Sequence, residues 1–114
     1  MFNSMSKKFL LKNDAYRKNR GGYSRFLNIL CEGCGTHLLF YQKDGSGELK
    51  RMYLDRIISP KILSSKKRGF TCHSCKRVIG IFYIYAKEKR PAIRLYQGSV
   101  LKKIVPGDYS ALKH

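Results

Sequence analysis

The spacing of the four cysteines constrains this chain more than any other feature. They form two Cys-x-x-Cys pairs, Cys31/Cys34 and Cys72/Cys75, with 37 residues between the pairs. Such a turn places two sulfurs about 3.5–4 Å apart and points them at one centre, so two turns supply the four ligands of a tetrahedral Zn²⁺ ion. Four thiolates leave no coordination position open for water, and we therefore expect one structural zinc rather than a catalytic one.

Other uses of four cysteines fit the sequence less well. A disulfide scaffold would normally accompany a secretory signal, and the start MFNSMSKKFLLKN has only a three-residue apolar run. Thioredoxin-like redox motifs use a single pair at the start of a helix, whereas β-like sequence follows both pairs here. An iron centre of the rubredoxin type uses the same four sulfurs and stays open. We expect His37 and His73, which lie near the pairs, to be neighbours of the site rather than ligands.

The segments after each pair have the composition of β-hairpins. In the first, residues 37–43 and 48–57 flank the turn signal Asp44-Gly45-Ser46-Gly47. In the second, the β-prone run 78–86 is followed by a polar loop at 87–91, a return strand at 92–97 and a further short strand at 99–105. The sequence thus predicts a small, β-rich, metal-stabilised domain built from two Cys-x-x-Cys knuckles, each followed by a β-hairpin.

The knuckles CEGCG and CHSCK, each leading into a predicted hairpin, resemble the zinc-ribbon class. That class includes ribosomal proteins, archaeal and eukaryotic transcription factors and polymerase subunits. The resemblance covers residues 30–105 and rests on ligand spacing and hairpins. It implies a zinc-ribbon domain at residues 23–105, between a basic arm at 1–22 that is flexible or ordered by a partner and a tail at 106–114.

The charge of the chain points to a polyanionic partner. Twenty-four Lys and Arg stand against seven Asp and Glu, a formal net charge of +17 that is spread along the whole sequence. Four thiolates and one zinc would lower this only to roughly +15. A balance this basic favours nucleic acid over a membrane surface or an acidic protein.

Aromatic residues beside arginines favour RNA over DNA, because exposed bases stack on both kinds of side chain. In strand alternation, Tyr83 and Tyr85 share one face, and Arg51 shares a face with Tyr53. Basic clusters supply the expected phosphate contacts. The predicted nucleic-acid-binding residues are Lys7, Lys8, Arg17, Lys18, Arg20, Arg51, Lys66, Lys67, Arg68, Lys76, Arg77, Lys87, Lys89, Arg90, Arg94, Tyr83, Tyr85, Tyr96, Lys102 and Lys103.

These features favour a cytoplasmic, ribosomal or ribosome-associated RNA-binding protein, in contact with rRNA and with ribosomal proteins. A DNA- or transcription-associated zinc ribbon is the alternative, since Asp44 and Glu48 flank the first predicted hairpin tip. An adaptor for an acidic protein is a third hypothesis. The basic, acid-poor start also leaves a mitochondrial or other organellar presequence open.

We expect no enzymatic activity and no small-molecule substrate. The sequence contains no Ser-His-Asp order, no HExxH motif, no Walker loop and no paired carboxylates in a plausible cleft. A membrane span is not expected either, because the longest apolar run, residues 78–86, is far shorter than the roughly 20 residues that a helix needs to cross a bilayer.

Overall fold

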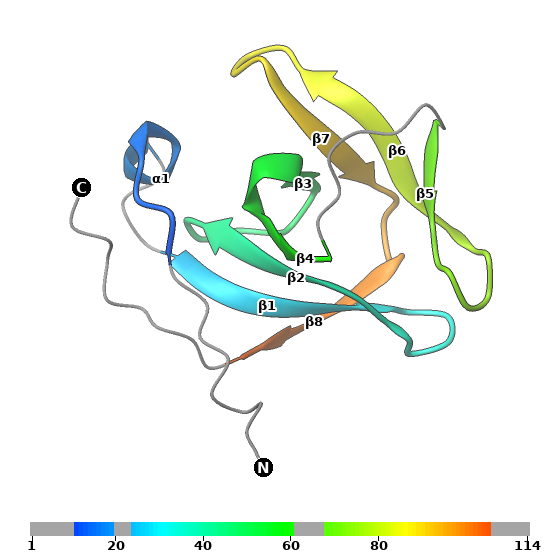
Figure 1. Ribbon diagram of the computed structural model, residues 1–114. Helices are drawn as coiled ribbons and strands as arrows, with labels where there is room; N and C mark the ends of the chain where they lie inside the picture. Colours follow the sequence, from blue (N-terminus) through cyan, green and yellow to red (C-terminus); the bar gives the residue numbers. More distant parts are fainter. Residues whose placement is uncertain (1–10, 20–23, 61–67, 106–114) are drawn as a thin grey trace.

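The computed structural model describes residues 11–19, 24–60 and 68–105, and within these ranges the chain forms eight β-strands, one α-helix and one short 3-10 helix (Figure 1). The β-rich class predicted from the sequence is confirmed. In chain order the elements are α1 (Ala15–Asn19), β1 (Ser24–Cys31), β2 (His37–Asp44), β3 (Arg51–Tyr53), η2 (Leu54–Arg56), β4 (Ile57–Ser59), β5 (Gly69–Thr71), β6 (Val78–Tyr85), β7 (Arg90–Leu95) and β8 (Val100–Ile104).

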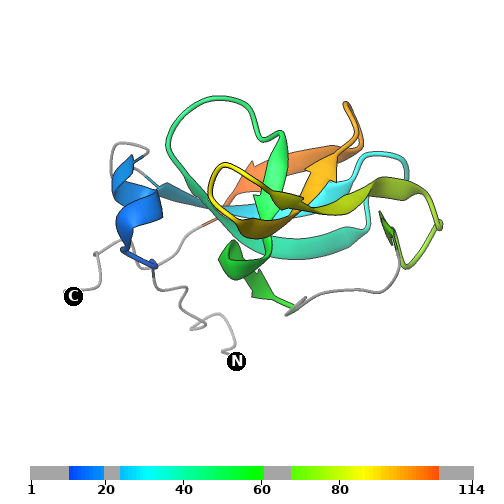
Figure 2. The same cartoon turned by 90° about the horizontal axis from the view of Figure 1, so that it is seen from above.

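The strands form two antiparallel sheets of four strands each. The first has the order β4-β2-β1-β8 and the second the order β3-β7-β6-β5. Figure 1 shows β1, β2 and β8 on one side of the molecule and β5, β6 and β7 on the other, and in the view from above in Figure 2 the yellow β6 passes in front of the first sheet. Side chains of alternate residues along a strand share a face. Leu27 and Ile29 of β1 are accordingly buried in one hydrophobic cluster with Met52 and Ile93 of the second sheet, so the main core lies between the sheets.

The outer face of the first sheet is covered by the segment before α1. Leu11 and Phe26 are 1% and 0% exposed and form a second, smaller cluster. The Lys12 backbone N–H donates to Gln42 Oε1 at 2.7 Å, and Gln42 Nε2 donates back to the Lys12 carbonyl at 2.9 Å. Residues 11–19 belong to the range that the sequence assigns to an arm, yet they pack on the sheet through partners 30 residues away in the chain. The rest of that range, 1–10 and 20–22, lies outside the described residues.

The first predicted hairpin is wrong. Strand β2 pairs with β1 and with β4, whereas β3 pairs with β7 in the other sheet, where Met52 lies opposite Ile93. The chain therefore crosses from one sheet to the other after Asp44. The predicted change of chain direction at residues 44–47 is present, since Gly45 and Gly47 have φ angles of +79° and +99°. A turn signal does not specify the partner of the following strand, and here Met52 is buried in the core only by joining β7.

The second predicted hairpin is confirmed. Strands β6 and β7 are antiparallel, with Phe82 opposite Ile93 and Ile84 opposite Pro91. The expected short strand at 99–105 is present as β8, which pairs with β1. Strand alternation in the run 78–86 predicts Phe82 and Ile84 on one core-facing side, and the structure differs at one of them. Phe82 packs against the main core, but Ile84, which lies near the turn of the hairpin, is 60% exposed.

Candidate metal centre and basic surface

Both Cys-x-x-Cys pairs lie in turns that join neighbouring antiparallel strands, and the two turns have the same hydrogen bonds. In the β1–β2 turn, the Cys31 N–H donates to the Thr36 carbonyl at 2.8 Å, and the Gly35 N–H donates to the Cys31 carbonyl at 2.8 Å. In the β5–β6 turn, Cys72 and Lys76 make the equivalent bonds at 2.9 and 3.0 Å.

The residue after the second cysteine of each pair adopts the left-handed conformation. Its φ angle is +77° at Gly35 and +69° at Lys76. Glycine adopts this conformation without steric cost, whereas a lysine does so only under constraint from its surroundings. Two turns of different sequence thus hold their cysteines in one common geometry.

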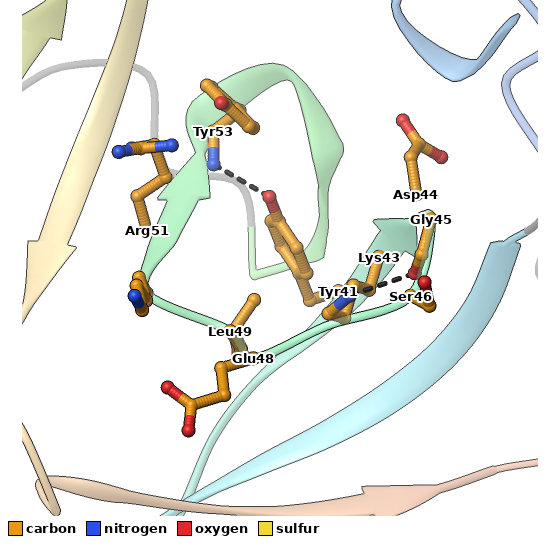
Figure 3. A pocket seen from close by; sticks show the side chains of 10 residues that line it. Tyr41, Lys43, Asp44, Gly45, Ser46, Glu48, Leu49, Arg51 and Tyr53 are labelled. Atoms are coloured by element: carbon orange, nitrogen blue, oxygen red, sulfur yellow. Dashed lines mark hydrogen bonds between the residues drawn. The ribbon is translucent and has the colours of Figure 1, made fainter. Parts of the chain in front are cut away.

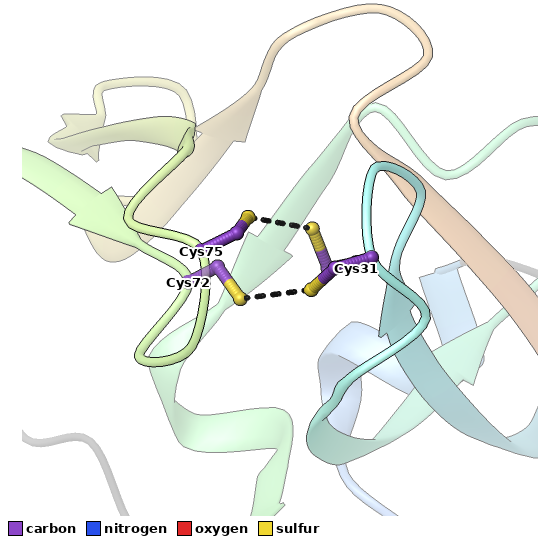
Figure 4. Close-up of side chains that lie close together, drawn as sticks. Cys31, Cys72 and Cys75 are labelled. Atoms are coloured by element: carbon purple, nitrogen blue, oxygen red, sulfur yellow. Dashed lines mark hydrogen bonds between the residues drawn. The ribbon is translucent and has the colours of Figure 1, made fainter.

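The four sulfurs converge from the two sheets on one centre (Figure 4). Cys31 Sγ lies 3.7 Å from Cys75 Sγ, Cys34 Sγ lies 3.6 Å from Cys72 Sγ, and all four sulfurs are within 4.8 Å of one another. These separations are too long for disulfides, and the cysteines are free thiols. A tetrahedron with metal–sulfur bonds of about 2.3 Å has sulfur–sulfur edges of about 3.8 Å. The four cysteines are therefore arranged to hold one metal ion.

Polar contacts around the sulfurs favour the thiolate form that a metal requires. The Ser74 N–H points at Cys72 Sγ at 3.4 Å, and Thr36 Oγ1 lies 3.0 Å from Cys34 Sγ. Hydrogen bonding with Thr36 lowers the pKa of Cys34 to about 6. At Cys75 the N–H of Arg77 also favours the thiolate, but burial and the neighbouring sulfurs outweigh it and raise the pKa to about 11. Four thiols this close resist ionising together unless a cation neutralises them.

Two residues near the cysteines, His37 and Arg77, contact other side chains and do not belong to the sulfur cluster. His37 Nδ1 lies 2.6 Å from Asn28 Oδ1, and neither His37 nor the exposed His73 belongs to the sulfur cluster. Arg77 Nη1 donates to Glu32 Oε1 at 2.9 Å and so joins the two cysteine turns. A side chain at Gly33 would place its Cβ 2.8 Å from Arg77 Nη1, so the missing side chain leaves room for this link.

A second cluster, which we call the arginine cluster, was not found by sequence reasoning. It consists of Arg56 and Arg90, which are 2% and 4% exposed, with their carboxylate partners. Arg56 donates to Asp14 at 2.6 and 3.0 Å and to Asp44 at 2.8 Å. Arg90 donates to Asp55 at 2.8 Å and to Glu88 at 2.9 Å.

Aromatic rings complete the surroundings of Arg90. Its guanidinium carbon lies 3.9 Å from the centroid of the Tyr16 ring and 3.7 Å from that of Tyr53. Cation–π contacts of this kind are stronger when the cation is removed from water. Arg90 was predicted to contact nucleic acid, but the structure places it between α1 and the second sheet, away from the solvent.

The arginine cluster and the Arg77–Glu32 pair engage five of the six carboxylates of the described residues; only Glu48 has no ion pair there. Most of the predicted contact residues in the described ranges lie at the surface, although Arg77 is paired there with Glu32. Exposed among them are Lys18, Arg68, Lys76, Arg77, Lys87, Lys89, Arg94, Tyr96, Lys102 and Lys103, while Arg17, Arg51, Tyr83 and Tyr85 are partly buried. Lys7, Lys8, Arg20, Lys66 and Lys67 lie outside the described residues.

The second sheet carries arginine and tyrosine together on one face, as the strand alternation predicted. The register sets Arg51 opposite Arg94 and Tyr83 opposite Ala92. Arg51 Nε donates to the Tyr83 hydroxyl at 2.9 Å, and its guanidinium lies 4.1 Å from the centroid of the Tyr85 ring. These contacts fix the direction of the Arg51 guanidinium.

Hollows surround the segment 45–50, where the chain crosses between the sheets. Figure 3 shows the hollow lined by Tyr41, Glu48 and Arg51, in which the Tyr53 N–H donates to the Tyr41 hydroxyl at 2.8 Å. A larger hollow of about 630 Å³, which we call the crossover groove, lies beside it. Its lining residues are Glu48, Leu49, Lys50, Arg51, Arg94, Leu95, Tyr96, Gln97, Gly98, Val100 and Lys102.

Comparison of the chain with known protein families, with curated proteins and with solved structures gives no match. Across the part of the chain that the structure describes, no helix has the length and apolar character that crossing a membrane requires.

Proposed function

We propose that the four cysteines bind one structural Zn²⁺ and that the domain is a member of the zinc-ribbon class in the broad sense of two metal-binding turns on β-hairpins. The support is the donor set, since four thiolates in a closed tetrahedral arrangement are typical of structural zinc. When bound, the ion would connect the two sheets at one end of the core. The proposed role is structural stabilisation, with no catalytic step at the metal.

We propose further that the protein is a non-catalytic RNA-binding protein, ribosomal or ribosome-associated and cytoplasmic. One observation carries this proposal: five of the six carboxylates of the described residues form ion pairs, while most of the lysines and arginines of the described residues face the solvent. Neutralising phosphates and releasing their counterions gives such a surface strong affinity for nucleic acid. Arg51, held beside Tyr83 and Tyr85, adds the combination of side chains on which unpaired bases stack.

The arrangement of the acidic residues gives less support to the alternative of a DNA- or transcription-associated zinc ribbon. It depended on Asp44 and Glu48 at the tip of the first predicted hairpin. The side chain of Asp44 is 4% exposed and paired with Arg56, which removes one of the two carboxylates from the surface. An adaptor role toward an acidic protein uses the same basic surface, and binding that survives nuclease treatment would favour it.

Sedimentation of a native lysate through a high-salt sucrose gradient tests the proposal. At about 0.5 M salt loose phosphate contacts are largely screened. We expect the protein to remain with a ribosomal subunit and to be released by ribonuclease. A protein found at the top of the gradient would contradict the ribosomal role, and release by deoxyribonuclease alone would favour the DNA alternative.

A further inference from the structure

We propose that the crossover groove is the site where this protein binds a single-stranded segment of RNA, with phosphates on its lysines and arginines and a base on Tyr96. This inference rests on the proposed RNA-binding function and adds the location, the strandedness and the contacting residues.

The groove has walls from both sheets. The segment 48–51 crosses between the sheets along one side, the end of β7 and the following turn form a second side, and Val100 and Lys102 of β8 form the third. Its volume of about 630 Å³ lies within the roughly 300–1,000 Å³ that is usual for sites enclosing a small ligand. The hollow is therefore large enough for a nucleotide.

The groove carries more positive charge than its own carboxylate compensates. Four basic residues line it, Lys50, Arg51, Arg94 and Lys102, against the single carboxylate of Glu48. Arg51 and Arg94 lie directly opposite each other in the β3–β7 register, and like charges in that position are destabilising. Among the described residues, none forms an ion pair with Arg94, Lys50 or Lys102. An anion from outside the chain would relieve this repulsion, and phosphodiester groups supply it at regular spacing.

Tyr96 supplies a platform for a base. It is 48% exposed, although its backbone is held firmly: its N–H donates to the Ile79 carbonyl at 3.0 Å, and its carbonyl accepts from the Ser99 N–H at 3.1 Å. The turn closes at Gly98, whose φ is +74°. Only an unpaired base can lay its face on such a ring, which favours a single strand over a duplex.

Strand β8 offers a matched pair of variants. Lys102 lies opposite the buried Ile29 and faces the groove, whereas its neighbour Lys103 lies opposite Asn28 on the other face. Both are exposed, so Lys102→Glu and Lys103→Glu make the same charge change on one strand. The experiment measures binding of the zinc-loaded full chain to a short fluorescein-labelled single-stranded RNA of mixed sequence by fluorescence anisotropy.

We expect Lys102→Glu to weaken binding about tenfold and Lys103→Glu by less than about threefold. Tyr96→Leu should also weaken binding about tenfold, because it removes a stacking platform without changing charge. For Lys102→Gln, the slope of log affinity against log salt should fall by about 0.7, as expected for the loss of one phosphate contact of a single strand. Should Lys102→Glu fail to fold, the comparison of Arg94→Glu in the groove with Lys87→Glu in the β6–β7 turn replaces it.

The outcomes separate this inference from the proposed function. If the wild-type protein binds RNA and both lysine variants weaken it equally, the groove is not the site but the RNA-binding function stands. If the wild-type protein does not bind RNA, both proposals fail. If unlabelled duplex DNA displaces the RNA as well as unlabelled single-stranded RNA does, the assignment to a single strand is wrong.

Discussion

The cysteine cluster and the arginine cluster fasten different parts of the molecule by opposite distributions of charge. In the first, four sulfur ligands from the β1–β2 and β5–β6 turns surround the place of one cation. In the second, two arginine cations hold four carboxylates and thereby join the residue before α1, the end of β2, η2 and β7. Each cluster connects segments that are far apart in the sequence, as a small domain with a limited core requires.

The difference between the clusters lies in where the cation comes from. The arginine cluster carries its own cations and is complete in the chain alone. The cysteine cluster needs an ion from outside, so its contribution to stability depends on metal supply and on thiol deprotonation. The arginine cluster also pairs four carboxylates with cations, so they do not oppose an anionic partner, which links the stability of the fold to the proposed RNA binding.

The largest effect is expected from Cys72→Ser. This cysteine is 0% exposed and supplies one of the four ligands, and a structural zinc site contributes about 10–16 kcal/mol of binding free energy that is coupled to folding. We expect the variant to lose stoichiometric metal and its cooperative thermal transition, monitored by circular dichroism. His73→Ala, the exposed neighbour, is the control and should melt like the wild type. A Cys72→Ser protein with an unchanged midpoint would show that the metal does not hold the fold.

Arg56→Met should have the next largest effect. It removes the buried guanidinium and leaves the carboxylates of Asp14 and Asp44 without their partner, a change that typically costs about 3–5 kcal/mol. The free energy of unfolding in urea gives the measurement. Arg94→Met, the same substitution at an exposed site, should change it by less than about 0.5 kcal/mol. Equal effects at the two positions would mean that the arginine cluster contributes nothing particular to stability.

A smaller effect is expected from pH through Asp14. Burial works against its charge, but the hydrogen bond from Arg56 and the nearby positive charges lower the pKa of this carboxyl below its ordinary 3.8. The stability from ionised Asp14 is therefore fully present above the ordinary pKa and is lost as the pH falls through the lowered folded-state pKa. Because the side chain is 41% exposed, we expect less than about 1 kcal/mol.

The measurement for Asp14 is the difference in urea midpoint between the wild type and Asp14→Asn from neutral pH to pH 3. Acid also protonates the cysteines and releases metal in both proteins, so only the difference reports on Asp14. The difference in urea midpoint between the two proteins should become smaller as the pH falls below the ordinary carboxyl pKa. A difference that stays constant across this range would contradict the assigned ion pair.

The cysteine cluster was predictable from sequence, and the arginine cluster was not, for a physical reason. A Cys-x-x-Cys turn sets the geometry of two ligands within four residues, so each half of the site can be predicted from a short stretch of sequence. The partners of Arg90 include Asp55, which lies 35 positions earlier in the chain, and nothing local distinguishes Arg90 from the exposed Lys87 and Lys89 of the same polar loop. The charged pair Asp55-Arg56 within an otherwise apolar stretch was the one available signal.

The fold shows the same division between local and long-range information. The β6–β7 hairpin was predictable because a strongly β-prone run is broken by a polar loop and then resumes. The strand after Gly47 carries an equally good pattern, but its partner β7 lies about 40 residues later in the chain, and only the burial of Met52 against Ile93 decides that pairing.

The most direct test of this account is the metal content of the purified native protein, measured by native mass spectrometry before and after treatment with a chelator at neutral pH. We predict one Zn²⁺ per chain, with loss of the ion accompanied by loss of the folded charge-state distribution. A protein that carries no metal and retains its folded distribution would contradict the structural role of the cysteine cluster, and one iron per chain would contradict its assignment to zinc.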